Sequence, residues 1–165
     1  MIVLKFGGTS VANAQNIQRV IKIVSEKAQQ DELVVVVSAL SGVTDMLIDA
    51  SLKAAKKDEL YKQNIEEIKQ KHLDTISDLV AVSNQHQLLG DINNHLYVLQ
   101  TLLDGCFLLG ELTPRTADAI AGFGELLSSQ IIATAIQQVL PNTSFKDSRE
   151  LIETNSIWKS NCRIC

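Results

Sequence analysis

The residues whose types and spacing could carry chemistry begin at the start of the chain, where Lys5 is followed by Gly7-Gly8 and Thr9-Ser10. The two glycines let the backbone turn without a Cβ and come close to a ligand. Thr9 and Ser10 stand where a helix would begin, so their hydroxyls could cap it and its free N–H groups could face an anion. With the positive charge of Lys5 beside the turn, the segment predicts a phosphate site. Its spacing is that of neither the P-loop nor the Rossmann motif, and the alternative is a merely tight strand-to-helix connection.

A second polar segment, Ser38–Asp45, directly follows the apolar run Leu33–Val37. In an open parallel sheet, ligands bind beyond the carboxyl ends of the strands, so this loop and the Gly7-Gly8 loop should open on the same crevice. Small hydroxyl side chains around a glycine can bind a carboxylate or phosphate oxygen without filling the space it needs. The alternative is simple capping of the next helix by Ser41 or Thr44.

A single carboxylate, Glu125, lies in the apolar, helix-prone segment Gly122–Ser129. A carboxylate in such a setting is costly to bury unless a cation pairs with it. The ammonium group of a substrate would serve, and so would Lys5 or Arg115 in a purely structural ion pair. A solvated helix face is the third possibility.

The segment from Lys5 to Ala12, Lys-Phe-Gly-Gly-Thr-Ser-Val-Ala, resembles the opening motif of the aspartokinases, within the wider amino-acid kinase family. The continuation Val-Ala-Asn-Ala is most similar to the bifunctional aspartokinase–homoserine dehydrogenases. The resemblance implies transfer of the γ-phosphoryl group of ATP to the side-chain carboxylate of L-aspartate, giving 4-phospho-L-aspartate. That reaction is the first step toward lysine, threonine and methionine. ATP with Mg²⁺ is the implied cofactor, and no carboxylate of this chain is assigned as a metal ligand.

The resemblance also assigns roles to residues. Lys5 is the implied catalytic charge, and Gly7, Gly8, Thr9 and Ser10 belong with it to the implied phosphate site. The remaining assignments concern the amino acid: Ser38 and Thr44 would contact aspartate, and Glu125 would hold its amino group. Phe123 stands where some relatives carry a polar or basic residue before the Gly-Glu pair.

Hydrophobic periodicity predicts the elements that must position these residues. A strand over 2–6, a helix over 13–30 capped by Asn13 and a strand over 33–37 form a βαβ unit, which is parallel and right-handed in nearly all cases. The predicted strands are apolar enough for burial on both faces. The elements expected after them are helices over about 45–57, 60–85 and 88–109, a long helix from Thr116 to about Val139, and a strand over 144–146.

These elements and the resemblance together predict an α/β fold, the N-terminal part of an amino-acid kinase α/β/α sandwich with a mostly parallel sheet and a helix-rich insertion. We expect one domain over 1–165, the amino-acid-binding portion of an aspartokinase. Nothing in the sequence matches the family's nucleotide-binding half, so the chain alone is expected to be inactive. The alternatives are another amino-acid kinase, such as an acetylglutamate kinase, or a substrate-binding or interaction module without catalysis.

Composition sets the expected partners. A net charge of −4 gives no reason to expect nucleic acid or a membrane. No secretory signal pattern is present at the N-terminus, and we expect a cytoplasmic homo-oligomer with a small-molecule substrate. The three cysteines (Cys106, Cys162 and Cys165) form an odd set that suits a reducing compartment better than a disulfide framework.

The cysteine pair near the end of the chain and the three histidines could in principle bind metals, but their spacing does not predict a metal site. Cys162 and Cys165 form a C-x-x-C at the end of the chain, without a second Cys or His pair, and so predict neither a metal nor a redox site. His72, His86 and His95 lack ligand spacing and are expected on solvated helix surfaces.

Overall fold

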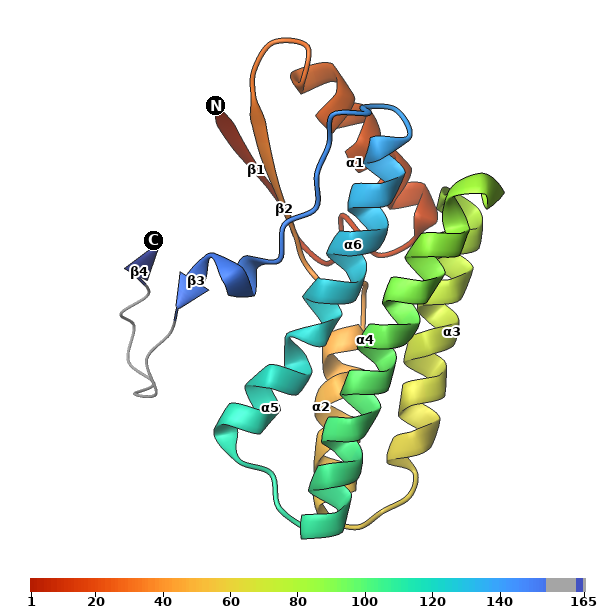
Figure 1. Ribbon diagram of the computed structural model, residues 1–165, viewed down its shortest axis with the longest axis vertical. Helices are drawn as coiled ribbons and strands as arrows, with labels where there is room; N and C mark the ends of the chain where they lie inside the picture. The colour runs from red at the N-terminus through yellow and green to blue at the C-terminus, as the bar shows by residue number, and fades with distance from the viewer. Residues whose placement is uncertain (154–162, 165) are drawn as a thin grey trace.

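The computed structural model describes residues 1–153 and 163–164, and Figure 1 shows the order and arrangement of its elements. The elements are β1 (Ile2–Phe6), α1 (Ala14–Lys27), β2 (Leu33–Val37), α2 (Val43–Ala55), α3 (Tyr61–Leu79), α4 (Val82–Leu109), α5 (Pro114–Ala121), α6 (Phe123–Gln137), a 3₁₀ turn (Ser148–Glu150), and the short pair β3 (Ile152–Glu153) and β4 (Arg163–Ile164).

The chain opens with the predicted βαβ unit. β1 and β2 pair in parallel, with Ile2 opposite Leu33 and Phe6 opposite Val37. Both strands have the predicted bounds: β1 is apolar except for Lys5 and ends before Gly7, and β2 is a continuous apolar run that ends before Ser38. The Asn13 side chain accepts a hydrogen bond from the Asn16 N–H and caps α1, as predicted. Thr9 and Ser10 therefore do not cap this helix, which begins only at Ala14.

The two strands bury one face of the sheet, not both. Inward side chains such as Leu4 and Val35 pack against the core, whereas Val3 is 61% exposed and Val34 and Val36 are more than 40% exposed. Successive side chains of a strand point to opposite faces, and within the described residues helices cover only one of them. The expectation of burial on both faces is wrong for these residues.

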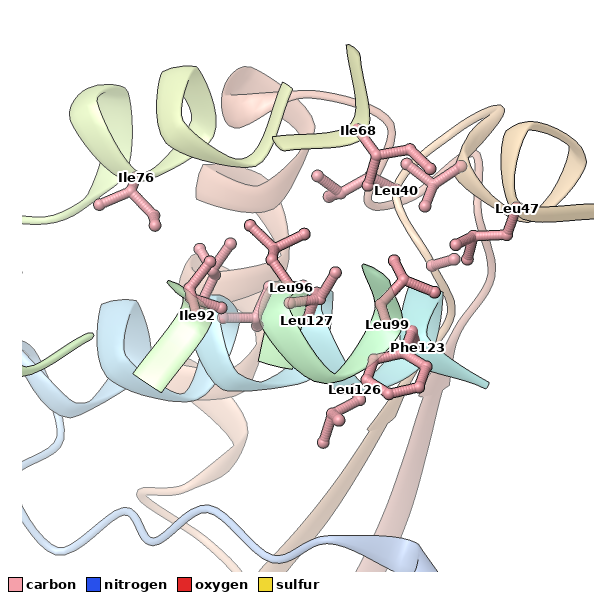
Figure 2. Packing of buried hydrophobic residues seen from close by; sticks show 14 of the residues in the cluster. Leu40, Leu47, Ile68, Ile76, Ile92, Leu96, Leu99, Phe123, Leu126 and Leu127 are labelled. Carbon is pink, nitrogen blue, oxygen red and sulfur yellow. The ribbon is translucent and has the colours of Figure 1, made fainter. Parts of the chain in front are cut away.

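The helices α2, α3 and α4 run side by side beyond the end of the sheet, and α6 passes alongside both parts (Figure 1). Their inward side chains form one apolar core with residues of α1 and of the loop after β2. Figure 2 shows Leu40 of that loop beside Ile68 and Leu47, with Leu99 and Leu127 across from them. The mixed α/β fold with a parallel sheet and a helix-rich part agrees with the fold class expected from the sequence.

Three local predictions are wrong. The expected long helix is two helices: Thr113, not Thr116, caps α5, which ends at Ala121, and Gly122 separates it from α6. Residues 144–146 form no strand, and no backbone hydrogen bond joins them to β2 among the described residues. His72 is fully buried in α3, whereas His86 is exposed as expected.

The stretch Pro114–Gln137 is long and apolar enough to cross a membrane by length and composition, but 56% of that window is buried inside the protein. Its apolar residues pack against α1, α2, α4 and β2. Burial in the core accounts for this composition.

Candidate functional site

The loops that follow the two parallel strands lie together. The Ser38 N–H donates a hydrogen bond to the Phe6 carbonyl (3.1 Å), which extends the ladder by one residue beyond β2. A Cβ on Gly8 would lie 3.7 Å from the Ala39 carbonyl oxygen and 3.9 Å from Ser38 Oγ. The predicted phosphate loop and the predicted amino-acid loop therefore meet at one end of the sheet, as the parallel topology requires.

The start of α6 packs against the second of these loops. A Cβ on Gly124 would lie 2.8 Å from the Ala39 Cβ, 3.4 Å from Leu47 Cδ1 and 3.5 Å from Val43 Cγ1. Real Cβ atoms do not approach that closely, so only glycine permits this contact. The close approach places Glu125, the next residue, beside the loop from Ser38 to Thr44.

Ser128 fixes the same contact with a hydrogen bond that the sequence analysis missed. Its side chain is fully buried, and Oγ donates to the Ser38 carbonyl (2.8 Å), with the Glu125 carbonyl 3.1 Å away. Ser128 thus joins residues 90 positions apart in the chain. The signal available in the sequence was a small hydroxyl residue one turn after Glu125 in an otherwise apolar helix face.

The loop after β2 is held from several sides. Gly42 has φ +77°, a conformation that L side chains rarely adopt, and turns the chain into α2. Lys71 of α3 donates its Nζ hydrogen bond to the Ser41 carbonyl (2.6 Å), and Leu40 is buried in the core. Thr44 lies half-buried in the first turn of α2. No side-chain hydrogen bond caps α2, so the capping alternative for Ser41 and Thr44 is wrong.

The loop after β1 forms a tight turn with open space beside it. The Ser10 N–H donates to the Gly7 carbonyl (2.9 Å), and Asn16 Nδ2 donates to the Thr9 carbonyl (2.9 Å). A Cβ on Gly7 would meet no atom within 4 Å. A shallow cavity of about 270 Å³ adjoins the turn and is lined by Phe6, Thr9, Ser10, Asn16, Arg19, Val20 and Ile23. Arg19 adds a cationic side chain that the sequence analysis did not single out.

The two charged residues of the predicted site are exposed. Lys5 lies on the outer face of β1, opposite Val36, and makes no ion pair with another described residue. Glu125 is exposed in the first turn of α6, where the helix dipole favours a carboxylate. Pairing of Glu125 with Lys5 or Arg115 is not seen within residues 1–153. Glu125 is therefore neither buried nor part of an ion pair among these residues, and its contact with the ammonium group of a substrate stays a prediction.

The larger cavity of the described structure, about 430 Å³, lies elsewhere. It lies between α1, β2, α6 and residues 142–146, and its lining includes none of the predicted site residues. Apolar side chains of α1, β2 and α6 line it together with polar residues of the 142–146 segment.

The residues present do not form a metal site. Within residues 1–153 and 163–164 no group of three or more His, Cys, Asp or Glu side chains could hold a metal ion. Cys106 is buried in α4 and reduced, and burial raises the pKa of its thiol. The C-x-x-C formed by Cys162 and Cys165 lies outside the described residues.

The assembled site offers three kinds of group at one end of the sheet. Backbone N–H groups and hydroxyls belong to the two loops, Lys5 is the next-to-last residue of β1, and Glu125 lies in the first turn of α6. The N-terminal ends of α2 and α6 add partial positive charge. Such an arrangement suits a ligand with both anionic and ammonium groups beside a phosphoryl group.

Comparison with known proteins identifies the family of this chain. The model of the amino acid kinase family matches residues 1–159. The chain is 34% identical over 151 residues to bifunctional aspartokinase/homoserine dehydrogenase 1 of Zea mays, covering 92% of this chain and 16% of the relative. It is 33% identical over 140 residues to aspartokinase 3 of Arabidopsis thaliana, covering 83% of this chain and 24% of the relative.

Solved structures show the same fold. Aspartokinase III of E. coli in complex with aspartate and ADP superposes with a TM-score of 0.81 at 24% identity, over 94% of this chain and 33% of that chain. The same enzyme in complex with lysine and aspartate gives a TM-score of 0.80. The chain thus spans about a third of that enzyme and about a sixth of the bifunctional relatives.

Proposed function

The chain belongs to the amino acid kinase family, and we propose that it is the amino-acid-binding part of an aspartate kinase. The reaction is attack of a side-chain carboxylate oxygen of L-aspartate on the γ-phosphorus of ATP. The bond from that phosphorus to the bridging oxygen breaks, so the products are 4-phospho-L-aspartate and ADP. This step would open the synthesis of the aspartate-derived amino acids.

The supporting observation is the convergence of three separate segments at one end of the sheet. Gly8 contacts the Ser38 loop, Gly124 permits contact between α6 and Ala39, and Ser128 bonds the Ser38 carbonyl. The relatives that share these segments are named aspartokinases, and one solved relative of the same fold holds aspartate and ADP.

Phosphoryl transfer passes through a loose transition state, so these residues have to position the two substrates and neutralise the charge of the transferring phosphoryl group. Lys5 would neutralise the transferring phosphoryl group, and the N–H groups of Gly7 and Gly8 would bind its oxygens. Ser38 and Thr44 would hold the amino acid through its oxygens, and Glu125 would hold its ammonium group.

The Mg²⁺ that accompanies ATP is not matched by the donor set of the described residues, which contain no metal-binding cluster. No step is assigned to it here. We expect the 165 residues alone to bind aspartate without turning over ATP. A binding or interaction module without catalysis remains the second candidate function, since the chain spans about a sixth of the bifunctional relatives. The cytoplasmic location expected from the sequence stays a prediction.

The test is a kinase assay on a protein that carries this chain together with a nucleotide-binding half. Glu125→Gln keeps the shape of the side chain but removes its charge. Hydrogen bonds to charged groups contribute about 1.5–3 kcal/mol, so the KM for aspartate should rise roughly 10- to 150-fold, with the KM for ATP little changed. Glu111→Gln, at another exposed glutamate outside the site, is the matched control and should change neither constant. Equal effects of the two variants would refute the role of Glu125.

A further inference from the structure

The outward face of α4 carries no charge. None of the 14 exposed residues of this helix is Asp, Glu, Lys or Arg, whereas five of the eight exposed residues of the neighbouring α3 are charged. The two acidic residues of α4, Asp91 and Asp104, are both half-buried, and Asp104 accepts a hydrogen bond from the Tyr61 hydroxyl. A solvated helix surface normally carries charged residues, so this face differs from an ordinary one.

Large apolar side chains protrude from the same face. Tyr97 is 73% exposed, Leu108 is 76% exposed and Val98 is 48% exposed. They belong to an outward stripe with spacings of three or four residues, as in helix-to-helix contacts. We define the α4 stripe as Ser83, Gln87, Gly90, Asn94, Tyr97, Val98, Thr101, Gly105 and Leu108.

The two glycines of the stripe have no internal explanation. Glycine in a helix interior destabilises it by roughly 0.5–1 kcal/mol relative to alanine. A Cβ on Gly90 or on Gly105 would meet no atom of the described residues within 4 Å, so neither glycine makes room for another described part of this chain. Since neither helix propensity nor an internal contact explains the two glycines on this helix face, we interpret them as space for a close approach by another molecule.

The α4 stripe is also self-complementary in the antiparallel sense. If the helix is turned about a two-fold axis between Tyr97 and Val98, Gly90 of one copy meets Gly105 of the other. By the same register Asn94 meets Thr101, and Gln87 meets Leu108. Small residues then oppose small residues, and an amide opposes a hydroxyl.

We propose that the α4 stripe is a two-fold interface, through which two copies of this chain pack their α4 helices antiparallel. Each chain carries a net charge of −4, so copies repel one another except where a face is uncharged. A C2 interface uses the same patch twice and requires this kind of self-complementarity. A specific interface needs about 1,000 Å² of buried surface in total, and a contact through one helix of each copy has little area beyond that, so the dimer should be weak and concentration-dependent.

The outer face of the sheet is the competing surface. It also exposes apolar residues (Val3, Val34 and Val36), but it carries Lys5 among them. Two copies meeting there would bring two lysine charges together. The uncharged α4 stripe is therefore the favoured interface.

Sedimentation velocity over a range of concentrations separates the two surfaces. Tyr97→Lys puts two like charges at the proposed axis and should shift the chain to monomer at every concentration tested. Val34→Lys is the matched control on the sheet face and should leave the dimer unchanged, with circular dichroism confirming that both variants fold. A monomeric wild-type chain, or a dimer lost only in Val34→Lys, would overturn the proposal.

The glycines give a second test in which stability and association move in opposite directions. Gly90→Ala with Gly105→Ala should raise the melting temperature of the monomer, because alanine favours the helix. The same double variant should weaken the dimer at least tenfold, because it adds a methyl group at each crossing point. An unchanged or stronger dimer in the double variant would contradict close helix packing at these positions.

The register is tested by cross-linking in a background with Cys162→Ser and Cys165→Ser. A mixture of Asn94→Cys and Thr101→Cys chains should form the mixed disulfide-linked dimer in preference to either homodimer. Preferential homodimers of Thr101→Cys would indicate a parallel pair and refute the antiparallel arrangement.

Discussion

Replacing Ser128 with alanine tests whether one hydrogen bond holds the candidate site together. Ser128 Oγ donates to the Ser38 carbonyl at 2.8 Å and is fully buried, so no water can replace it in the variant without rearrangement. A buried acceptor left without its donor costs about 1–3 kcal/mol. We expect Ser128→Ala to lower the free energy of unfolding by that amount.

The neighbouring serine supplies a matched control. Ser129 Oγ donates to the Leu126 carbonyl of its own helix (3.0 Å) and joins no other element. Ser129→Ala gains the same helix propensity as Ser128→Ala, so the difference between the two variants isolates the bond to Ser38. We expect Ser129→Ala to change the unfolding free energy by no more than about 0.5 kcal/mol.

Urea unfolding followed by circular dichroism measures this difference. With a slope of about 2 kcal/mol per molar urea, the midpoint of Ser128→Ala should fall roughly 0.5–1.5 M below that of Ser129→Ala. Hydrogen exchange should accelerate in the loop Ala39–Gly42 of the first variant and not of the second. Equal midpoints and equal exchange in the two variants would refute the claim that Ser128 fixes this loop.

Three further changes probe separate parts of the account. Gly124→Ala should destabilise the fold by about 1–3 kcal/mol because its Cβ would lie 2.8 Å from that of Ala39, whereas Gly7→Ala should leave unfolding unchanged and weaken phosphate binding. Burial lowers the pKa of His72 below 6.5, so the folded protein favours the neutral imidazole. The contribution of His72 to the free energy of unfolding should be complete above pH 6.5. Below pH 6.5 it should fall by up to about 1.4 kcal/mol per pH unit until the lowered pKa is passed. Lys5→Ala should reduce kcat about 100-fold or more in a protein that includes the nucleotide-binding half, because a charge contact to the transferring phosphoryl group is lost.

Each of these changes has a result that contradicts it. Equal unfolding curves for Gly124→Ala and Gly7→Ala would mean that α6 does not need the close contact. If His72→Leu lost as much stability below pH 6.5 as the wild type, a group other than His72 would cause that loss. His86→Leu, at an exposed histidine, is the control. Near-normal turnover by Lys5→Ala would remove the lysine from the catalytic site.

Local patterns predicted the part of the fold that depends on neighbouring residues. The strands at 2–6 and 33–37 are apolar except for Lys5, and Asn13 caps α1 through its own side chain, so the strands and the cap were predictable from short segments. The parallel pairing followed because a strand–helix–strand unit has one common topology. The meeting of the two loops followed from the same rule.

Features that depend on distant residues were not predictable. Glu125 has apolar neighbours in sequence, but Phe123, Leu126 and Leu127 lie on the buried side of α6 and Glu125 on the other. His72 is buried because α3 is covered on that side by other helices. The hydrogen bond from Ser128 to the Ser38 carbonyl spans 90 residues, and the sequence shows only that Ser128 is a small hydroxyl residue on an apolar helix face, not which group it contacts.

The central claim is that the loop after β2 and the start of α6 bind an amino acid with a second carboxylate. The direct measurement is titration of L-aspartate into the ¹⁵N-labelled chain, followed by NMR shifts of the backbone amides. The account predicts saturable shifts at residues 38–44 and 124–128, which Glu125→Gln weakens and which N-acetyl-L-aspartate, lacking the ammonium group, does not produce. Shifts confined to the cavity between α1, β2, α6 and residues 142–146, or equal responses to the two ligands, would contradict it.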